Sequence, residues 1–135
     1  MTQDFIRYWI STYGGGDLDA CMACYADDVV FEDSIFGDRV EGKPAMREAF
    51  SAFILSDVTK LKFLGWDGGP EGGAALWEWT ADWGPDRTFL GFDASNKSFT
   101  VRGISALTLR DGLIVRQTDF WDARNALRQL GALDR

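Results

Sequence analysis

The spacing of apolar residues changes from helical to strand-like about halfway along the chain. In the first half, apolar side chains recur every three or four residues, and the first such stripe predicts a helix over Gln3–Tyr13. A run of glycines that begins at Gly14 ends this helix, and Asp17 is expected to cap a second helix that reaches Tyr25. Pro44 lies in the first turn of a third predicted helix, where proline is favoured.

In the second half, apolar and polar residues alternate, as they do in half-buried strands. Trp77 and Trp79 fall on one face of such a segment, and Glu78 falls on the other. The predicted elements are strands over Lys60–Trp66, Ala74–Trp83, Phe99–Leu109 and Leu113–Trp121, a glycine-rich turn over Asp67–Gly73, a hairpin turn at Asp111–Gly112 and a short closing helix over Ala123–Leu130. This order predicts a single α+β domain over residues 1–135, in which three N-terminal helices cross the concave face of a strongly curved antiparallel sheet.

An acidic pair follows a short apolar strand within the first half of the chain. An acidic turn over Ala26–Asp28 leads into the predicted strand Val29–Phe31, and Glu32 and Asp33 come directly after it. A loop then runs to Gly42, where the third helix begins. A carboxylate at the end of an apolar strand is a candidate for acid or base chemistry, because desolvation can tune its pKa.

The composition of the chain argues against some classes of binding partner. The 135 residues include 14 basic and 21 acidic side chains, and the net charge of −7 disfavours nucleic acid and anionic membranes as partners. The chain lacks an apolar run of the roughly 18 residues that a transmembrane helix needs. Residues 1–15 lack a signal-peptide pattern, so we expect a cytoplasmic protein. The 14% aromatic content fits either a cavity for a hydrophobic small molecule or simply a core of large residues.

Two cysteines form a CMAC tetrad, which raises the question of a metal or redox site. A zinc site would need about two further ligands, and the chain has no histidine and no cysteine besides Cys21 and Cys24. The tetrad also lies inside a predicted helix, away from the helix start that lowers the pKa of redox thiols. We therefore expect buried, unreacting thiols, no metal and no cofactor.

Three motifs carry a resemblance to a known family. They are GDLDACMACYADDVVFEDS at Gly16–Ser34, GKPAMREAF at Gly42–Phe50 and RDGLIVRQTDFWDARNALRQLG at Arg110–Gly131. In this order they resemble the cone-shaped fold shared by nuclear transport factor 2, ketosteroid isomerases, limonene epoxide hydrolases and SnoaL-like polyketide cyclases. The closing motif is most similar to the SnoaL-like group.

The resemblance to ketosteroid isomerases implies a site in the first half of the chain. Their general base matches Asp33, and their oxyanion-hole tyrosine matches Tyr8, or Trp9 if no gap is allowed in the comparison. Their protonated aspartate matches Ser105, a weaker donor. As a structural alternative, Asp33 caps the turn at Ser34.

The resemblance to the other enzymes points to the last strand. The second catalytic Asp of the epoxide hydrolases matches Asp119, but their Arg and first Asp match Trp79 and Ala81, which cannot activate water. In SnoaL-like cyclases the single acid/base residue of an aldol ring closure also matches Asp119, with Asp122 a weaker second. As a structural alternative, Asp119 only bonds to the backbone or to an Arg.

The strand faces indicate which residues accompany the carboxylates. Gln117 and Trp121 share the strand face of Asp119 and could orient a substrate, and Tyr25 could donate to an enolate oxygen. The predicted binding residues are Tyr8, Trp9, Tyr25, Phe31, Trp77, Trp79, Ser105, Gln117 and Trp121, with Asp33 and Asp119 as the catalytic candidates.

The sequence leaves three hypotheses open. The chain could be a cofactor-free acid/base catalyst of the isomerase or cyclase type, acting on a hydrophobic carbonyl compound in an aromatic pocket. It could bind a hydrophobic ligand without turnover, or it could be a dimerising interaction domain with a filled pocket. The convex sheet face carries Leu76, Ile104 and Phe120 and would suit a homodimer.

Overall fold

The computed structural model describes residues 1–14, 17–55 and 58–133, and of residues 52–55 only the backbone. The described elements are α1 (Thr2–Ser11), α2 (Leu18–Met22), β1 (Tyr25–Asp33), β2 (Asp38–Glu41), α3 (Lys43–Leu55), β3 (Thr59–Gly69), β4 (Gly72–Asp82), β5 (Thr88–Phe89), β6 (Phe92–Asp93), β7 (Ser98–Arg110), β8 (Leu113–Trp121) and α4 (Ala123–Gln129). The α+β class and the order of its main elements are as predicted.

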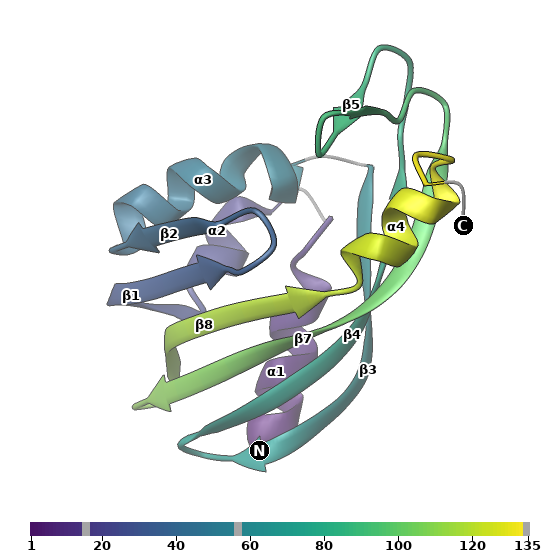
Figure 1. Ribbon diagram of the computed structural model, residues 1–135. Helices are drawn as coiled ribbons and strands as arrows, with labels where there is room; N and C mark the ends of the chain where they lie inside the picture. Colours follow the sequence, from purple (N-terminus) through teal and green to yellow (C-terminus); the bar gives the residue numbers. More distant parts are fainter. Residues whose placement is uncertain (15–16, 56–57, 134–135) are drawn as a thin grey trace.

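The main sheet is mixed rather than purely antiparallel. Its strand order is β2-β1-β8-β7-β4-β3, and β1 runs parallel to β8 while the other neighbours are antiparallel (Figure 1). The prediction of a purely antiparallel sheet was therefore wrong at one pair. Apolar alternation identifies a strand but carries no information on the direction of a partner far away in the sequence.

The acidic stretch is more extended than its pattern indicated. Tyr25 is the first residue of β1 rather than the end of a helix, and the predicted acidic turn lies within the strand at an irregularity of the pairing with β8. The predicted loop after Asp33 contains β2. Residues of β2 are mostly exposed and polar, so they lack the alternation that marks a half-buried strand.

The hairpin turns differ in how well the sequence predicts them. The turn at Asp111–Gly112 is confirmed, because both residues have the positive φ (53° and 77°) that tight hairpin turns require. The glycine-rich turn is shorter than predicted, since β3 and β4 continue through the glycines and leave only Pro70 and Glu71 between them.

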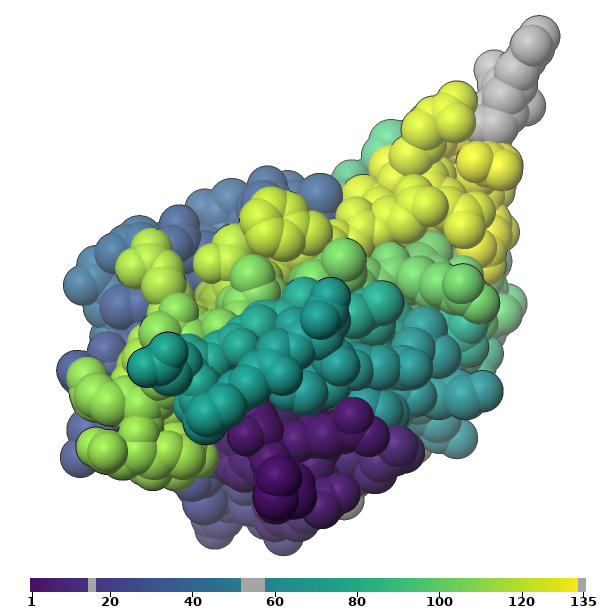
Figure 2. Space-filling model, turned by 90° about the horizontal axis from the view of Figure 1, so that it is seen from below, coloured from purple at the N-terminus to yellow at the C-terminus, as the bar shows by residue number. Residues whose placement is uncertain are grey.

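The helices cover one face of the curved sheet and bury an aromatic core against it. Helix α1 packs on β3, and α3 packs on β1 and β2. Seen from below, the N-terminal residues in purple lie against the teal β3–β4 segment (Figure 2). Alternate residues of β4, including Trp77 and Trp79, are buried on this concave face as predicted. Within the described part of the chain, no helix is long and apolar enough to span a membrane.

The convex face of the sheet carries a row of exposed apolar side chains. Leu76, Ile104 and Phe120 are paired neighbours on β4, β7 and β8, and their exposed fractions are 37%, 41% and 50%. The concave and convex faces of the same strands thus differ sharply in burial.

Gly103 gives room to the indole ring of Trp77 at the centre of the sheet. It pairs with Trp77 on β4 and with Trp121 on β8, so both large side chains flank it on the concave face. A Cβ atom at Gly103 would overlap the six-membered ring of Trp77 and approach the Phe120 carbonyl oxygen. The position therefore tolerates no side chain without a shift of Trp77.

We expect Gly103→Ala to lower the free energy of unfolding by about 1–3 kcal/mol, the usual cost of overpacking a core. Gly65→Ala is the matched control, because a Cβ at this β3 glycine meets nothing within 4 Å. It should change stability by less than about 0.5 kcal/mol. Urea unfolding of both variants measures the difference, and equal stabilities would contradict the packing role of Gly103.

Candidate active site

The register of the sheet places the two candidate carboxylates side by side. Asp33 on β1 pairs with Asp119 on β8, and Asp119 pairs with Ser105 on β7. Directly paired residues share one face of a sheet. This row places Asp33 and Asp119 on the concave face, on neighbouring strands.

Two adjoining cavities meet at these carboxylates. The first, which we call the inner pocket, measures about 50 Å³ and lies among Trp9, Trp77, Trp79, Trp121 and Gln117. The second, which we call the outer chamber, measures about 450 Å³ and lies among Phe31, Val40, Ala49, Phe50 and Arg39. Four residues line both: Tyr13, Asp33, Phe36 and Asp119. The outer chamber is in the size range of small-molecule sites.

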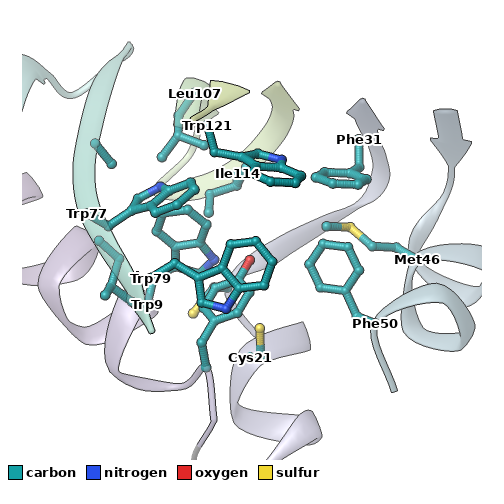
Figure 3. Close-up of a cluster of buried hydrophobic side chains, with 14 of the residues drawn as sticks. Trp9, Cys21, Phe31, Met46, Phe50, Trp77, Trp79, Leu107, Ile114 and Trp121 are labelled. Atoms are coloured by element: carbon teal, nitrogen blue, oxygen red, sulfur yellow. The ribbon is translucent and has the colours of Figure 1, made fainter. Parts of the chain in front are cut away.

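Aromatic side chains form most of the walls. In Figure 3 the indoles of Trp9, Trp77, Trp79 and Trp121 gather on one side, and Phe31 and Phe50 meet on the other. Phe31 and Phe50 are in edge-to-face contact at 4.9 Å, and Trp79 and Trp121 at 5.2 Å. Such rings bury a large apolar area and leave few polar groups in the cavity.

One arm of a hydrogen-bond network reaches Asp119 from β4. The indole Nε1 of Trp77 donates to Ser105 Oγ at 3.0 Å, and Ser105 Oγ donates to Asp119 Oδ1 at 2.6 Å. An indole N–H can only donate. The serine hydroxyl therefore accepts from Trp77, and its own hydrogen is left for the carboxylate.

A second arm reaches Asp119 from α1. Trp9 Nε1 donates to the Tyr25 hydroxyl at 2.8 Å, and Tyr25 donates to Gln117 Oε1 at 2.7 Å. The Gln117 Nε2 then donates to both oxygens of Asp119, at 3.0 and 3.2 Å. An indole N–H can only donate and an amide oxygen can only accept, so each bond in this arm has a fixed direction, and both arms end as donors to Asp119.

The groups around Asp119 have opposing effects on the pKa of its carboxyl group. Desolvation by burial raises the pKa of its carboxyl group from 3.8 to about 7, and the neighbouring Asp33 adds to this rise. The hydrogen bonds from Ser105 and Gln117 lower it. Asp119 can therefore take up or release a proton near neutral pH, which suits general acid/base work.

Asp33 has a more structural setting. Its Oδ1 accepts from the backbone N–H groups of Ile35 and Phe36, both at 2.9 Å, and its Oδ2 accepts from Trp121 Nε1 at 3.2 Å. The first two bonds cap the turn after β1, which is the structural alternative considered for this residue. The third bond fixes the plane of the Trp121 ring.

The structure brings most of the predicted binding residues together. Trp9, Trp77, Trp79, Ser105, Gln117 and Trp121 line the inner pocket, and Phe31 lines the outer chamber. Tyr25 is fully buried, lines neither cavity, and donates a hydrogen bond to Gln117, which lines the inner pocket. Tyr8 is 53% exposed and lies outside both cavities, because it falls off the buried stripe of α1. The placement of Tyr8 in the pocket was wrong.

Tyr13 and Phe36 are site residues that the sequence reasoning missed. The Tyr13 hydroxyl lies 3.1 Å from that of Tyr25. Burial raises the pKa of both hydroxyls well above 10.0, so both keep their protons at neutral pH. In the sequence, only its place at the end of the apolar stripe of the first predicted helix indicated that Tyr13 would be buried. Phe36 lies in the turn between β1 and β2, and no sequence pattern indicated that it would line a cavity.

The cysteine prediction is confirmed as far as burial goes. Cys21 and Cys24 are both free and buried, and burial raises the pKa of their thiols to about 12 and about 11. Among the described residues, no group of three or more His, Cys, Asp or Glu side chains could hold a metal ion.

Comparisons with known proteins agree with this architecture. A family model described as a SnoaL-like domain matches residues 6–117. A search of curated protein sequences finds no match.

Solved structures with the same fold have low sequence identity. TsrD from Streptomyces laurentii is 24% identical with a TM-score of 0.76, over 96% of this chain and 94% of that chain. A hypothetical protein of ketosteroid isomerase-like fold from Catenulispora acidiphila, solved in complex with trimethylamine, is 14% identical with a TM-score of 0.75, over 98% and 96% of the two chains. SalBIII, described as an epoxide hydrolase/cyclase-like enzyme with a role in pyran ring formation, is 18% identical with a TM-score of 0.73, over 90% and 91%.

The raised pKa of Asp119 predicts a pH dependence of stability. Below its ordinary pKa of 3.8 the group is protonated in both states, and above about 7 it is ionised in both. Between these values the folded protein holds the extra proton, so the free energy of unfolding falls as pH rises from about 4 to about 7.

Asp119→Asn removes this contribution, because an amide does not titrate in that range. Urea unfolding between about pH 4 and pH 8 should show the wild type losing stability relative to the variant as pH rises. Parallel stability curves would contradict the assignment.

Proposed function

Because the chain belongs to the SnoaL-like domain family, we propose that it is a cofactor-free acid/base catalyst that acts on a hydrophobic carbonyl compound. The observation that carries the proposal is the position of Asp119. Its carboxylate lies where the inner pocket joins the outer chamber, with a pKa near neutrality and hydrogen-bond donors that hold it in place.

The proposed step is removal of a proton next to the carbonyl group. Asp119 accepts the proton, and the electron pair of the broken C–H bond moves onto the carbonyl oxygen to form an enolate. Return of the proton to another carbon of the conjugated system gives an isomerase. Attack of the enolate carbon on a second carbonyl forms a C–C bond and an alkoxide, which takes the proton back from Asp119 and gives a cyclase. The aromatic walls exclude water and so strengthen the interactions of the developing charge.

Tyr13 is the proposed donor to the enolate oxygen. Tyr25 directs its hydrogen to Gln117, so Tyr13 is the donor in the bond between the two hydroxyls. Tyr13 lines both cavities and can turn this hydrogen toward a substrate oxygen. It takes the role that the sequence comparison had given to Tyr8.

Hydrolysis of epoxides is not part of the proposal. The positions that match the water-activating Arg and Asp are Trp79 and Ala81, and both are buried. Aldol ring closure remains within it, since it needs only one acid/base residue and a pocket that folds the substrate. The pyran ring formation described for SalBIII is a different closure, through a C–O bond.

A deuterium-exchange assay tests the proposal without knowledge of the natural substrate. A panel of hydrophobic ketones and β-dicarbonyl compounds is incubated with the protein in heavy water, and mass spectrometry detects deuterium next to the carbonyl. We expect Asp119→Asn to slow exchange by about 10²–10⁴-fold, the usual contribution of a general base. Tyr13→Phe should slow it by about 10²-fold, as loss of an oxyanion donor does.

Asp111→Asn is the matched control for the lost charge. Asp111 lies in the β7–β8 turn with φ of 53°, where Asn is equally suited, so exchange should stay within about twofold of wild type. Equal exchange by wild type and Asp119→Asn would exclude Asp119 as the base.

Non-catalytic binding of a hydrophobic ligand is the second candidate function. It is favoured by the mainly apolar and aromatic side chains that line both cavities. Tight binding of a co-purified ligand, with no exchange in the panel, would select it.

We also propose a homodimer formed through the convex sheet face, on the basis of the exposed row Leu76, Ile104 and Phe120. Phe120→Glu should shift the sedimentation coefficient from dimer to monomer, because it places a charge in an apolar interface. Phe92→Glu is the control, since Phe92 is 40% exposed on β6, away from this face. A monomeric wild type would refute the proposal.

A further inference from the structure

We propose that the inner pocket is a binding site for small organic ammonium ions. The inference goes beyond the proposed reaction, because it rests on the walls of the pocket and needs no turnover. A ligand of this class would place its cationic head in the inner pocket and any apolar body in the outer chamber.

The walls of the inner pocket are mainly aromatic. Trp79 and Trp121 both line it, with their ring centroids 5.2 Å apart and their planes at 84°. Phe36 lies 5.4 Å from Trp121 at 45° and adds a third wall. Aromatic faces attract cations through their negative quadrupole, and tryptophan does so most strongly.

The polar part of the same pocket is acidic. Asp33 and Asp119 both line it, and among the described lining residues none is Lys or Arg. The indole Nε1 of Trp121 donates to Asp33 Oδ2 at 3.2 Å, and this bond holds one aromatic wall of the pocket against a carboxylate. A cation here is therefore surrounded by aromatic rings and two carboxyl groups together.

Among the described residues that line the two cavities, no basic side chain is free to neutralise the carboxyl groups of Asp33 and Asp119. Asp33 faces it from β1 and Tyr13 from the turn after α1, while Asp38 and Arg39 of β2 line the adjoining outer chamber. Arg39 is already paired with Glu32 at 3.1 Å and with Glu41 at 3.3 Å. The ammonium ion would favour the charged form of Asp119, since an opposite charge nearby stabilises a carboxylate.

The size of the pocket suits a compact head group. Its volume of about 50 Å³ compares with the roughly 10–15 Å³, on the same kind of measure, that a single water needs. A methylated ammonium group is of this scale, whereas a bulky ring is not. The rest of a longer molecule would find room in the outer chamber, at about 450 Å³.

Choline and its neutral isostere 3,3-dimethyl-1-butanol form the test pair. The two molecules have almost the same shape, and carbon replaces the charged nitrogen in the second. Isothermal titration of the wild-type protein at pH 8, where Asp119 is ionised, should show choline binding at least about tenfold more tightly than the alcohol. Equal or tighter binding of the alcohol, or no choline binding, would overturn the proposal.

Variants then identify the site. Asp119→Asn should weaken choline binding by about tenfold or more and leave binding of the neutral alcohol within about twofold. Asp111→Asn, which removes the same charge from a distant turn, should change neither. Choline binding that is unaffected by Asp119→Asn would overturn the assignment to this pocket.

The result of the choline-binding test can be told apart from the result of the deuterium-exchange test of the proposed reaction. Choline binding without deuterium exchange would support this site and count against the catalyst, and exchange without a preference for choline would do the reverse. The comparison of the two ligands on wild-type protein needs no substitution, so it holds even if a variant fails to fold.

Discussion

A carboxylate removed from water, with every hydrogen bond around it pointing inward, is the constraint on which this structure depends. Asp119 is desolvated on the concave face, and the donors Ser105 and Gln117 hold it. Both arms of the network begin at an indole, Trp77 or Trp9, which can only donate. The tryptophans therefore do more than fill the core, because each donates the first hydrogen bond of an arm that ends at Asp119.

The same aromatic residues explain how a small domain keeps a cavity open. Large rigid rings that meet edge to face cannot collapse into the space between them as flexible side chains can. Gly103, which pairs with both Trp77 and Trp121, leaves the space that the Trp77 ring occupies. Catalysis on a carbonyl compound and binding of an ammonium ion both draw on this combination of fixed rings and carboxyl groups. The fold family alone does not choose between them, since one fold hosts many functions.

Much of the site could be predicted from the strand patterns. Alternation places Gln117, Asp119 and Trp121 on one face, and Trp77 and Trp79 on one face of another strand, and the structure brings both faces to the inner pocket. Tyr8 was misplaced because one helical position moves a side chain by about 100°, which is enough to turn it to solvent. Phe36 could not be predicted, since a turn residue has no periodicity that shows where it points.

The sequence by itself determined the α+β class, the main elements and the pairing of helices with a curved sheet, because these follow from local periodicity and turn chemistry. Only the tertiary structure decided that β1 lies parallel to β8, which sets Asp33 beside Asp119. It also decided the pKa of Asp119 and the split into an inner pocket and an outer chamber. These properties depend on which distant groups surround a residue and how far they exclude water. Spacing along a chain does not carry that information.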